Sequence, residues 1–295
     1  YFSHGYGPVS KSLAGACVAI TSSAMCSAHN PAIMAQIDNQ WEIGAALFAP
    51  DRGFKANDDF QTPPFASIPP GTYDSDNDYF LIQHFAYTRK LDEDISVGMI
   101  VGGQGGMNTE YDSAVFTNFS SPGNVASSPT GMDLIQMFTG LNVAWQVNRQ
   151  NSLAIMPVLA VQRLEVQGLE PFRPFSKHPD HVTNQGEDWS YGGGVRLGWL
   201  WQVSDQLDIG ASYQTKLWMT EFDDYKGLLA EEGDFDIPPI IDLGFAYRFT
   251  PGWTLAFNYQ RIQFEEIASV SNAADLNFFD PNTPPLGSSN GLGFG

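Results

Sequence analysis

The side chains that most often carry out acid–base or metal chemistry are sparse in this 295-residue sequence. Five histidines are spread along it, namely His4, His29, His84, His178 and His181. Only His178 and His181 lie close together, three residues apart in a Pro-containing stretch without a neighbouring cysteine. No histidine has the spacing of a metal site or of a nucleophile elbow. An enzyme is therefore disfavoured.

Acidic residues gather in clusters, at Asp58–Asp59, at Asp74, Asp76 and Asp78, and at Asp223–Asp224. Alternating carboxylates can bind Ca²⁺, but the Gly-spaced calcium loop with its terminal Glu does not occur. We interpret the clusters as solvated loops that divalent ions bridge to lipopolysaccharide. The net charge of −19 argues against a nucleic-acid partner, which would call for the opposite sign.

The elements that carry these side chains have a hydrophobic period of two. Residues 241–249 give the clearest example, with large apolar side chains at odd positions and small or charged ones at even positions. Similar patterns predict nine strands, near residues 41–48, 79–89, 95–102, 141–147, 153–162, 191–203, 207–214, 241–249 and 255–259. No apolar run approaches the roughly 18 residues of a transmembrane helix. Only 16% of the residues are charged, so apolar surface is spread over many short segments.

The connections between these strands alternate in length. Short turns at residues 92–94, 148–151, 204–206 and 250–252 alternate with long segments at 50–78, 106–137, 173–188, 226–236 and 272–289. This parity is typical of a transmembrane antiparallel β-barrel, with tight periplasmic turns and long outer loops. Four aromatic residues beside the short turns fit an interfacial belt, namely Trp145, Trp201, Phe249 and Trp253. Residues 291–295 look like the start of a tenth strand, and we expect more strands to follow in the intact protein.

Residues 1–39 do not alternate and are rich in Gly, Ala and Ser, which predicts a compact plug in the barrel lumen. The motifs at residues 4–8 (HGYGP), 13–19 (LAGACVA) and 30–32 (NPA) resemble the N-terminal hatch of the FadL/TodX-like outer-membrane transporters. Residues 41–52 are similar to that family's first strand and its exit. The Asn-Pro-Ala element after a Gly/Ala-rich segment is the most specific of these features.

The resemblance implies a monomeric, 14-stranded, all-β barrel plugged by its N-terminus, of which about ten strands are present here. The hatch would comprise residues 1–39 and the barrel residues 40–295. Members of this family reside in the outer membrane of Gram-negative bacteria, use no cofactor, and transport hydrophobic molecules such as long-chain fatty acids or aromatic hydrocarbons passively. They are thought to release ligands sideways at a kinked third strand. A structural or adhesive barrel is the alternative, and an outer-membrane enzyme is a more remote one.

Three regions are candidates for the transport path. Residues near Gly7, Gly15 and Asn30-Pro31-Ala32 would gate it, although a static plug that only seals is a rival. Gly102 and Gly103 lie in a Gly-rich stretch of the third strand, which marks a bend and a lateral opening, or makes room for the plug. Phe116 and Phe119, in the loop after that strand, would capture ligands, or would form the loop's own core.

Cys17 and Cys26 both lie in the predicted hatch. In the oxidising periplasm they could form a disulfide that stiffens the plug. Two buried free thiols are equally compatible with the sequence.

Overall fold

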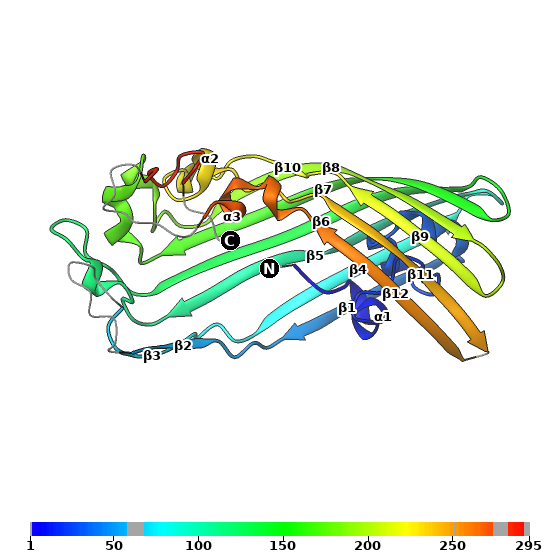
Figure 1. Ribbon diagram of the computed structural model, residues 1–295, viewed down its shortest axis with the longest axis horizontal. Coiled ribbons are helices and arrows are strands. Elements are labelled where there is room, and N and C mark those ends of the chain that lie inside the picture. Colours follow the sequence, from blue (N-terminus) through cyan, green and yellow to red (C-terminus); the bar gives the residue numbers. More distant parts are fainter. Residues whose placement is uncertain (1, 58–67, 251, 274–282, 292–295) are drawn as a thin grey trace.

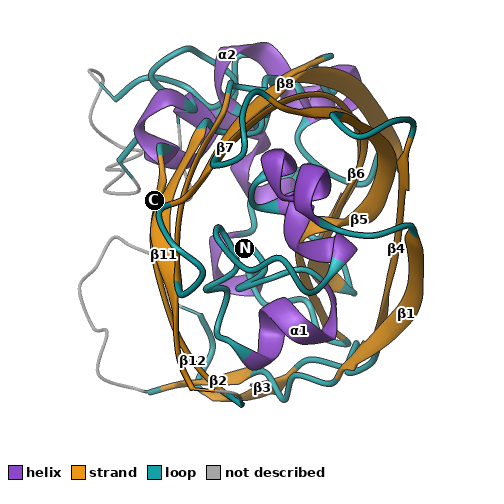
Figure 2. Ribbon diagram, turned by 90° about the vertical axis from the view of Figure 1, so that its right-hand side faces the viewer, coloured by secondary structure: helices purple, strands orange, loops and turns teal. Residues whose placement is uncertain are grey.

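A computed structural model describes residues 2–57, 68–250, 252–273 and 283–291 of the chain. Figure 1 shows long antiparallel strands side by side, and Figure 2 shows that their sheet curls around the N-terminal segment. The nine predicted strands follow one another in the sheet in sequence order. They are β1 (Gln40–Phe48), β4 (Phe80–Lys90), β5 (Ile95–Tyr111), β6 (Thr130–Gln146), β7 (Asn151–Gln167), β8 (Asp188–Gln202), β9 (Leu207–Gln214), β11 (Ile240–Thr250) and β12 (Trp253–Ile262).

The alternating pattern decides which way each side chain points. In β11, Ala246 and Asp242 are fully buried on the concave face, whereas Leu243 on the convex face is 47% exposed. The convex face is apolar along its length, with exposed residues such as Ile43, Leu81 and Leu159. This is the distribution that a barrel wall in lipid requires. No helix among the described residues is long and apolar enough to cross a membrane.

The predicted loop at residues 106–137 is shorter than expected. Strand β5 continues to Tyr111 and β6 already begins at Thr130. Glycines and polar residues interrupt the hydrophobic alternation in this part of both strands. The additional paired residues of β6 include Leu134, which belongs to a second apolar cluster with Leu164, Phe222 and Leu229. Strand length at this end is therefore set by tertiary packing, which the local pattern does not reveal.

A β-bulge interrupts the pairing of β5 with β6. Gly103 pairs with Met137 and Gly105 with Gln136, so Gln104 is an extra residue in β5. Its side chain is 1% exposed. Before the bulge even-numbered residues face inward, and after it odd-numbered residues do, because Gly105 lies opposite the buried Gln136.

Three short strands were not predicted, and two of them lie in the segment 50–78 that was predicted as a loop. β2 (Gly53–Ala56) and β3 (Gly71–Asp74) form a hairpin in which Phe54 stacks on Tyr73 with ring centroids 4.8 Å apart. β10 (Trp218–Met219) pairs with β8. The expected start of a tenth strand at 291–295 falls outside the described residues except for Gly291, which is not in a strand.

The connections at the end of the sheet where β5 ends and β6 begins, the long-loop end, contain short helices. They are η3 (Thr117–Phe119), η4 (Glu170–Phe175), η5 (Pro179–His181), η6 (Asp223–Tyr225), α2 (Ala230–Gly233), η7 (Phe264–Glu266) and α3 (Ala268–Ser271). Several of their residues belong to the second apolar cluster. The four aromatics beside the short turns lie at the opposite end. Trp145, Phe249 and Trp253 are exposed there, and Trp201 is half-buried, as an interfacial belt requires.

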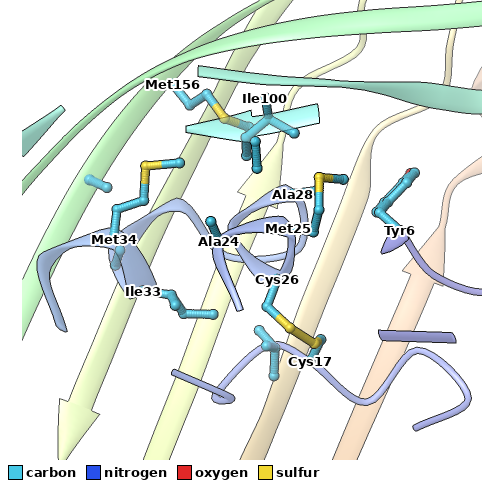
Figure 3. Close-up of a cluster of buried hydrophobic side chains, with 14 of the residues drawn as sticks. Tyr6, Cys17, Ala24, Met25, Cys26, Ala28, Ile33, Met34, Ile100 and Met156 are labelled. Carbon is cyan, nitrogen blue, oxygen red and sulfur yellow. A yellow bond between two sulfur atoms is a disulfide. The ribbon is translucent and has the colours of Figure 1, made fainter. Parts of the chain in front are cut away.

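Before β1, the chain forms α1 (Gly7–Ser12), η1 (Ala24–Ala28) and η2 (Pro31–Gln36). These elements contact β1 and β4 to β8 from the concave side. Met25, Ile33 and Met34 of this segment pack with Ile100 and Met156 of the sheet, as Figure 3 shows. The main apolar core therefore lies between the N-terminal segment and the sheet.

Candidate functional site

Strands β4 and β5 pair over only part of their length. Their last paired rung joins His84 to Gly102. Beyond it, β4 continues to pair with β1 as far as Phe80, while β5 continues to pair with β6 as far as Tyr111. The bulge at Gln104 lies just past the last rung. The two strands therefore separate, and we call the region between residues 80–83 and 103–106 the β4–β5 split.

A cavity of about 180 Å³ lies at the split, on the concave side of the sheet. Its walls come from α1 and the residues before it, from β1, from β4 and from β5. The lining residues include Gly7, Lys11, Ile82, His84, Gly102 and Gly103. Three of the predicted site residues, Gly7, Gly102 and Gly103, are therefore brought together.

The glycines at this cavity have little room for side chains. A Cβ on Gly103 would lie 3.2 Å from Cγ2 of Ile82, and one on Gly102 would lie 3.3 Å from Cε1 of Phe138. Gly7 has a φ of +72°, and its Cβ would lie 3.0 Å from Met25. Larger residues at these positions would fill the cavity or push its walls apart.

The chain's N-terminus covers part of the split. Phe2 forms an antiparallel bridge with Gly105, and the backbone N–H of Ser3 donates to the carbonyl of Gln104 over 3.3 Å. These residues pair with β5 at the point where β4 has left it. The unpaired edge of β5 is thus partly satisfied by residues that belong to no strand of the sheet.

The predicted Asn30-Pro31-Ala32 element lies on the other side of the N-terminal segment, against β6 and β8. The Asn30 side chain accepts from the Ala32 N–H over 3.1 Å and so caps η2. Its Nδ2 donates to the carbonyls of Val18 and Trp199 over 2.8 and 2.9 Å. The carbonyl of Pro31 accepts from Nδ2 of Asn142 over 2.8 Å. This element is therefore an anchor to the sheet and does not line the cavity.

Sequence reasoning missed Arg196 of β8, which is 2% exposed. Its guanidinium donates to the backbone carbonyls of Ala28 and His29, and Nη2 donates to Oε1 of Gln214 over 2.8 Å. Ser212 of β9 also donates to the carbonyl of His29. Since Ala28 and His29 are more than 160 residues away from Arg196 in sequence, no local pattern could have identified this contact.

The concave face is more polar than we expected from its many Gly and Ala residues. Besides Arg196, it buries Asp208 and Asp242. Asp208 pairs with Arg248 over 2.8 Å, and Asp242 accepts from two amide side chains of β12. These charges are compensated by partners on the sheet or the N-terminal segment, as buried charges must be.

Burial lowers the pKa of His29 to about 4, and a weaker effect of Asp242 opposes it. Nε2 of His29 lies 2.9 Å from Oγ of Ser10. The neutral ring of His29, the residue that follows η1, therefore connects η1 to α1. Burial also raises the pKa of Tyr6 to about 12. The ring of Tyr6 packs on His29 at 5.2 Å and on Phe138 at 5.3 Å. Tyr6 and His29 therefore lie in a buried region close to the charges of Arg196 and Asp242.

Gly15 and the two cysteines shape the N-terminal segment itself. Gly15 has a φ of +87°, and a Cβ there would clash with the carbonyl of His4 at 2.1 Å. It forms the turn after α1 and does not line the cavity. Cys17 and Cys26 are joined by a disulfide, with Cα atoms 5.4 Å apart.

Phe116 and Phe119 lie in the connection between β5 and β6, away from the cavity. Their rings pack edge-on at 5.8 Å, and both contact Phe172 of the next long connection. Leu228 and Leu229 are buried nearby in the second apolar cluster, so they provide no exposed surface for capture. The packing of Phe116 and Phe119 fits the loop-core interpretation and leaves ligand capture untested.

The acidic clusters lie at the long-loop end. Asp76 is exposed, and the neighbouring Asp112 raises the pKa of its carboxyl. His178 lies 3.8 Å from Glu232, in an ion pair that requires the protonated ring. Asp58 and Asp59 lie outside the described residues.

Comparison with known proteins gives one family. The sequence profile of the family described as outer membrane protein transport protein (OMPP1/FadL/TodX) matches residues 6–280. No curated protein sequence matches.

Among solved structures, the fold is similar to the toluene transporter TodX of P. putida. The TM-score is 0.68 at 18% identity, over 90% of this chain and 72% of that one. It is also similar to the toluene transporter TbuX of Ralstonia pickettii, with a TM-score of 0.66 at 17% identity, over 90% and 73% of the two chains. For a FadL homologue of Pseudomonas aeruginosa the TM-score is 0.58 at 14% identity, over 90% and 70%.

Proposed function

Because the chain belongs to the OMPP1/FadL/TodX family of outer-membrane transport proteins, we propose that it admits hydrophobic small molecules into a Gram-negative cell by passive diffusion. Similar folds occur in proteins named as toluene transporters and as a monoaromatic hydrocarbon channel. Moving an apolar solute into water costs about 25 cal/mol per Å² of its surface. A protected path from the long-loop end to the membrane avoids that cost.

In this proposal, residues 1–39 act as a hatch and residues 40–295 as part of the barrel wall. The protein works as a monomer without a cofactor, and the acidic loops at the long-loop end face lipopolysaccharide. The family is one of transport proteins, and we assign no catalytic step to this chain.

The β4–β5 split is the observation that carries the proposal. A closed wall has no unpaired strand edge, because backbone groups facing lipid must be satisfied. Here two long strands diverge at a bulge, and a cavity lies directly behind the gap. This arrangement supports lateral release of the ligand into the membrane between β4 and β5. Gly7, Gly102 and Gly103 would border the exit.

The gate is the bridge that Phe2 and Ser3 form with the free edge of β5. It consists of backbone contacts with one strand and of the packing of the Phe2 ring on Phe264, so its opening disrupts fewer contacts than separating two strands of the sheet. Displacing these residues would uncover the split, whereas the anchored Asn30-Pro31-Ala32 element would stay in place.

A disulfide between Phe2→Cys and Gly105→Cys tests this gate. Partners in an antiparallel bridge have Cα atoms about 4.5–5.5 Å apart, which a disulfide can span. We expect the oxidised double variant to take up a labelled alkylbenzene and a labelled long-chain fatty acid at least about tenfold more slowly than the parent, with recovery after reduction. The two single variants and the reduced parent serve as controls.

Unchanged uptake in the fully oxidised variant would contradict gating at this position and would favour a static hatch. If the correctly inserted parent takes up neither probe, the transport proposal itself is wrong, and a structural or adhesive barrel becomes the better interpretation.

A further inference from the structure

The β4–β5 split is closed at the long-loop end by the residues that lead into β4. There the backbone N–H of Asp76 donates to the carbonyl of Glu110, near the end of β5, over 2.9 Å. The backbone N–H of Glu110 donates to Oγ of Ser75 over 3.1 Å. Nδ2 of Asn77 donates to Oε2 of Glu110 over 3.3 Å. We call residues 75–77 together with Glu110 the clasp.

The clasp has the same register as the paired part of β4 and β5. The last rung joins His84 to Gly102. Asp76 lies eight residues before His84, and Glu110 lies eight residues after Gly102. The two segments therefore separate and meet again without a shift in register, with seven residues of each between the two contacts. At about 3.3 Å per residue, the split is a slot at most roughly 26 Å long that is closed at both ends.

Arg52, the residue before the β2–β3 hairpin, holds the clasp from the other side. Its carbonyl accepts from the backbone N–H of Ser75 over 2.8 Å, and its guanidinium donates to the carbonyl of Asn77. The guanidinium also lies over the ring of Phe80, the first residue of β4, with Cζ 5.2 Å from the ring centroid. Ser75 is only 5% exposed. The clasp therefore ties both the start of β4 and the hairpin to the end of β5.

We propose that the clasp limits the size of the molecule that can leave through the β4–β5 split. A slot fixed at both ends widens only as far as its two sides can bow apart, whereas a slit with one free end can open much further. The hydrogen bonds of the clasp join it to β5 and to Arg52, so it can stay closed while Phe2 and Ser3 move. Ser75, Asn77 and Glu110 thus determine specificity by size. The inference rests on the proposed function, because it concerns the exit proposed there.

The first test loosens the clasp with the double variant Ser75→Ala/Asn77→Ala, which removes both side-chain hydrogen bonds to Glu110. We expect the Glu110 amide of the purified full-length protein to exchange its hydrogen about tenfold faster, because its acceptor is lost. Uptake is then compared for two isomeric hydrocarbons, the slim n-nonylbenzene and the bulky symmetric triisopropylbenzene. The bulky-to-slim uptake ratio should rise about tenfold, which is the lower end of the discrimination that small differences in shape provide.

A disulfide between Asp76→Cys and Glu110→Cys tests the clasp in the opposite direction, since hydrogen-bonded antiparallel partners have Cα atoms about 5.5 Å apart. We expect the oxidised form to keep the uptake ratio of the parent. Reduction leaves neither the disulfide nor the Glu110 carboxylate, so it should raise the ratio. Ser289→Ala/Asn290→Ala makes the same two substitutions in the exposed connection after β12. This matched control should change neither hydrogen exchange at Glu110 nor the uptake ratio.

An unchanged exchange rate of the Glu110 amide in Ser75→Ala/Asn77→Ala would show that the clasp does not hold this end of the split, and would overturn the inference. Faster exchange with an unchanged uptake ratio would overturn it as well, and so would equal ratios in the oxidised and reduced disulfide variant. In these cases both hydrocarbons are still taken up. A correctly inserted parent that takes up neither contradicts the transport proposal itself, and the inference with it.

Discussion

The N-terminal segment contacts the sheet in two different ways. Toward β6, β8 and β9 it is fastened by side-chain hydrogen bonds from Asn142, Arg196 and Ser212, all of which end on its backbone carbonyls. Toward β1, β4 and β5 it borders a cavity. There Glu42 of β1 accepts from Ser23 and Ala24, and the bridge of Phe2 with Gly105 and the hydrogen bond from Ser3 to Gln104 join the first described residues to β5. We call these the anchored side and the open side. In the proposed transport path, the residues that move would be those at the open side.

The largest expected effect is on the anchored side. Arg196→Leu removes a charged donor to the buried carbonyls of Ala28 and His29 and leaves His29 with Ser212 alone, which costs about 3 kcal/mol. We expect amides in η1 and η2 to exchange their hydrogens about a hundredfold faster, while the strands remain protected. Arg149→Leu, in an exposed short turn, is the control. If the amides of η1 and η2 exchange equally slowly in Arg196→Leu and in the parent, the anchored side is held by apolar packing alone.

Asn30→Ala should have a smaller effect of the same kind. It removes the cap of η2 and the hydrogen bonds to Val18 and Trp199, which together contribute about 2 kcal/mol. We expect faster exchange confined to η2 and its flanks. Limited proteolysis of the folded protein is a second readout. Faster hydrogen exchange in α1 as well would show that the anchored side and the open side are not independent.

On the open side, Gly103→Leu should slow uptake of a hydrophobic probe about tenfold without loosening η1 or η2. The new side chain would contact Ile82 and fill the split. Val97→Leu enlarges the same strand where it is still paired with β4 and serves as the control. If Gly103→Leu transports normally, the split is not the exit, and the glycines there serve only to accommodate the N-terminal segment.

The smallest effect is expected from pH. The folded protein holds His29 neutral with a pKa of about 4, below the ordinary value of 6.5. Lowering the pH through this interval protonates the histidine of an opened segment but not of the closed one, so closure is weakened as pH falls from 6.5 toward 4. We expect the protease sensitivity of residues 24–36 to increase over that range. His29→Gln should make the sensitivity less dependent on pH.

The sequence predicted all nine long strands because each contains a stretch of alternating residues, as 241–249 does. It missed the ends of β5 and β6, where Met107 and Leu134 face inward after the bulge has changed the phase of the pattern. It also missed β2 and β3, which are only four residues long. Strands could thus be predicted wherever the alternation of apolar and polar residues was long and unbroken.

The candidate site was predictable only in part. The glycines in the N-terminal segment and in the third strand predicted Gly7, Gly102 and Gly103 as site residues, because glycine allows two backbones to approach closely and a strand to bend. The roles of Arg196 and Asn142 depend on contacts across more than 100 residues. The position of His84 between Gly44 on β1 and Gly102 on β5 depends on the register of three strands. Neither can be inferred from local spacing.

The single extra residue in β5 changes which sequence positions face inward. Up to Gly102 the even-numbered side chains face inward, and from Gly105 the odd-numbered ones do. Deleting Gln104 would remove the bulge and leave a regular strand, in which Met107, Thr109 and Tyr111 keep both their partners on β6 and their inward orientation. The extra residue therefore affects the local bend and twist of β5 beside the split, while pairing with β6 determines which side chains face inward.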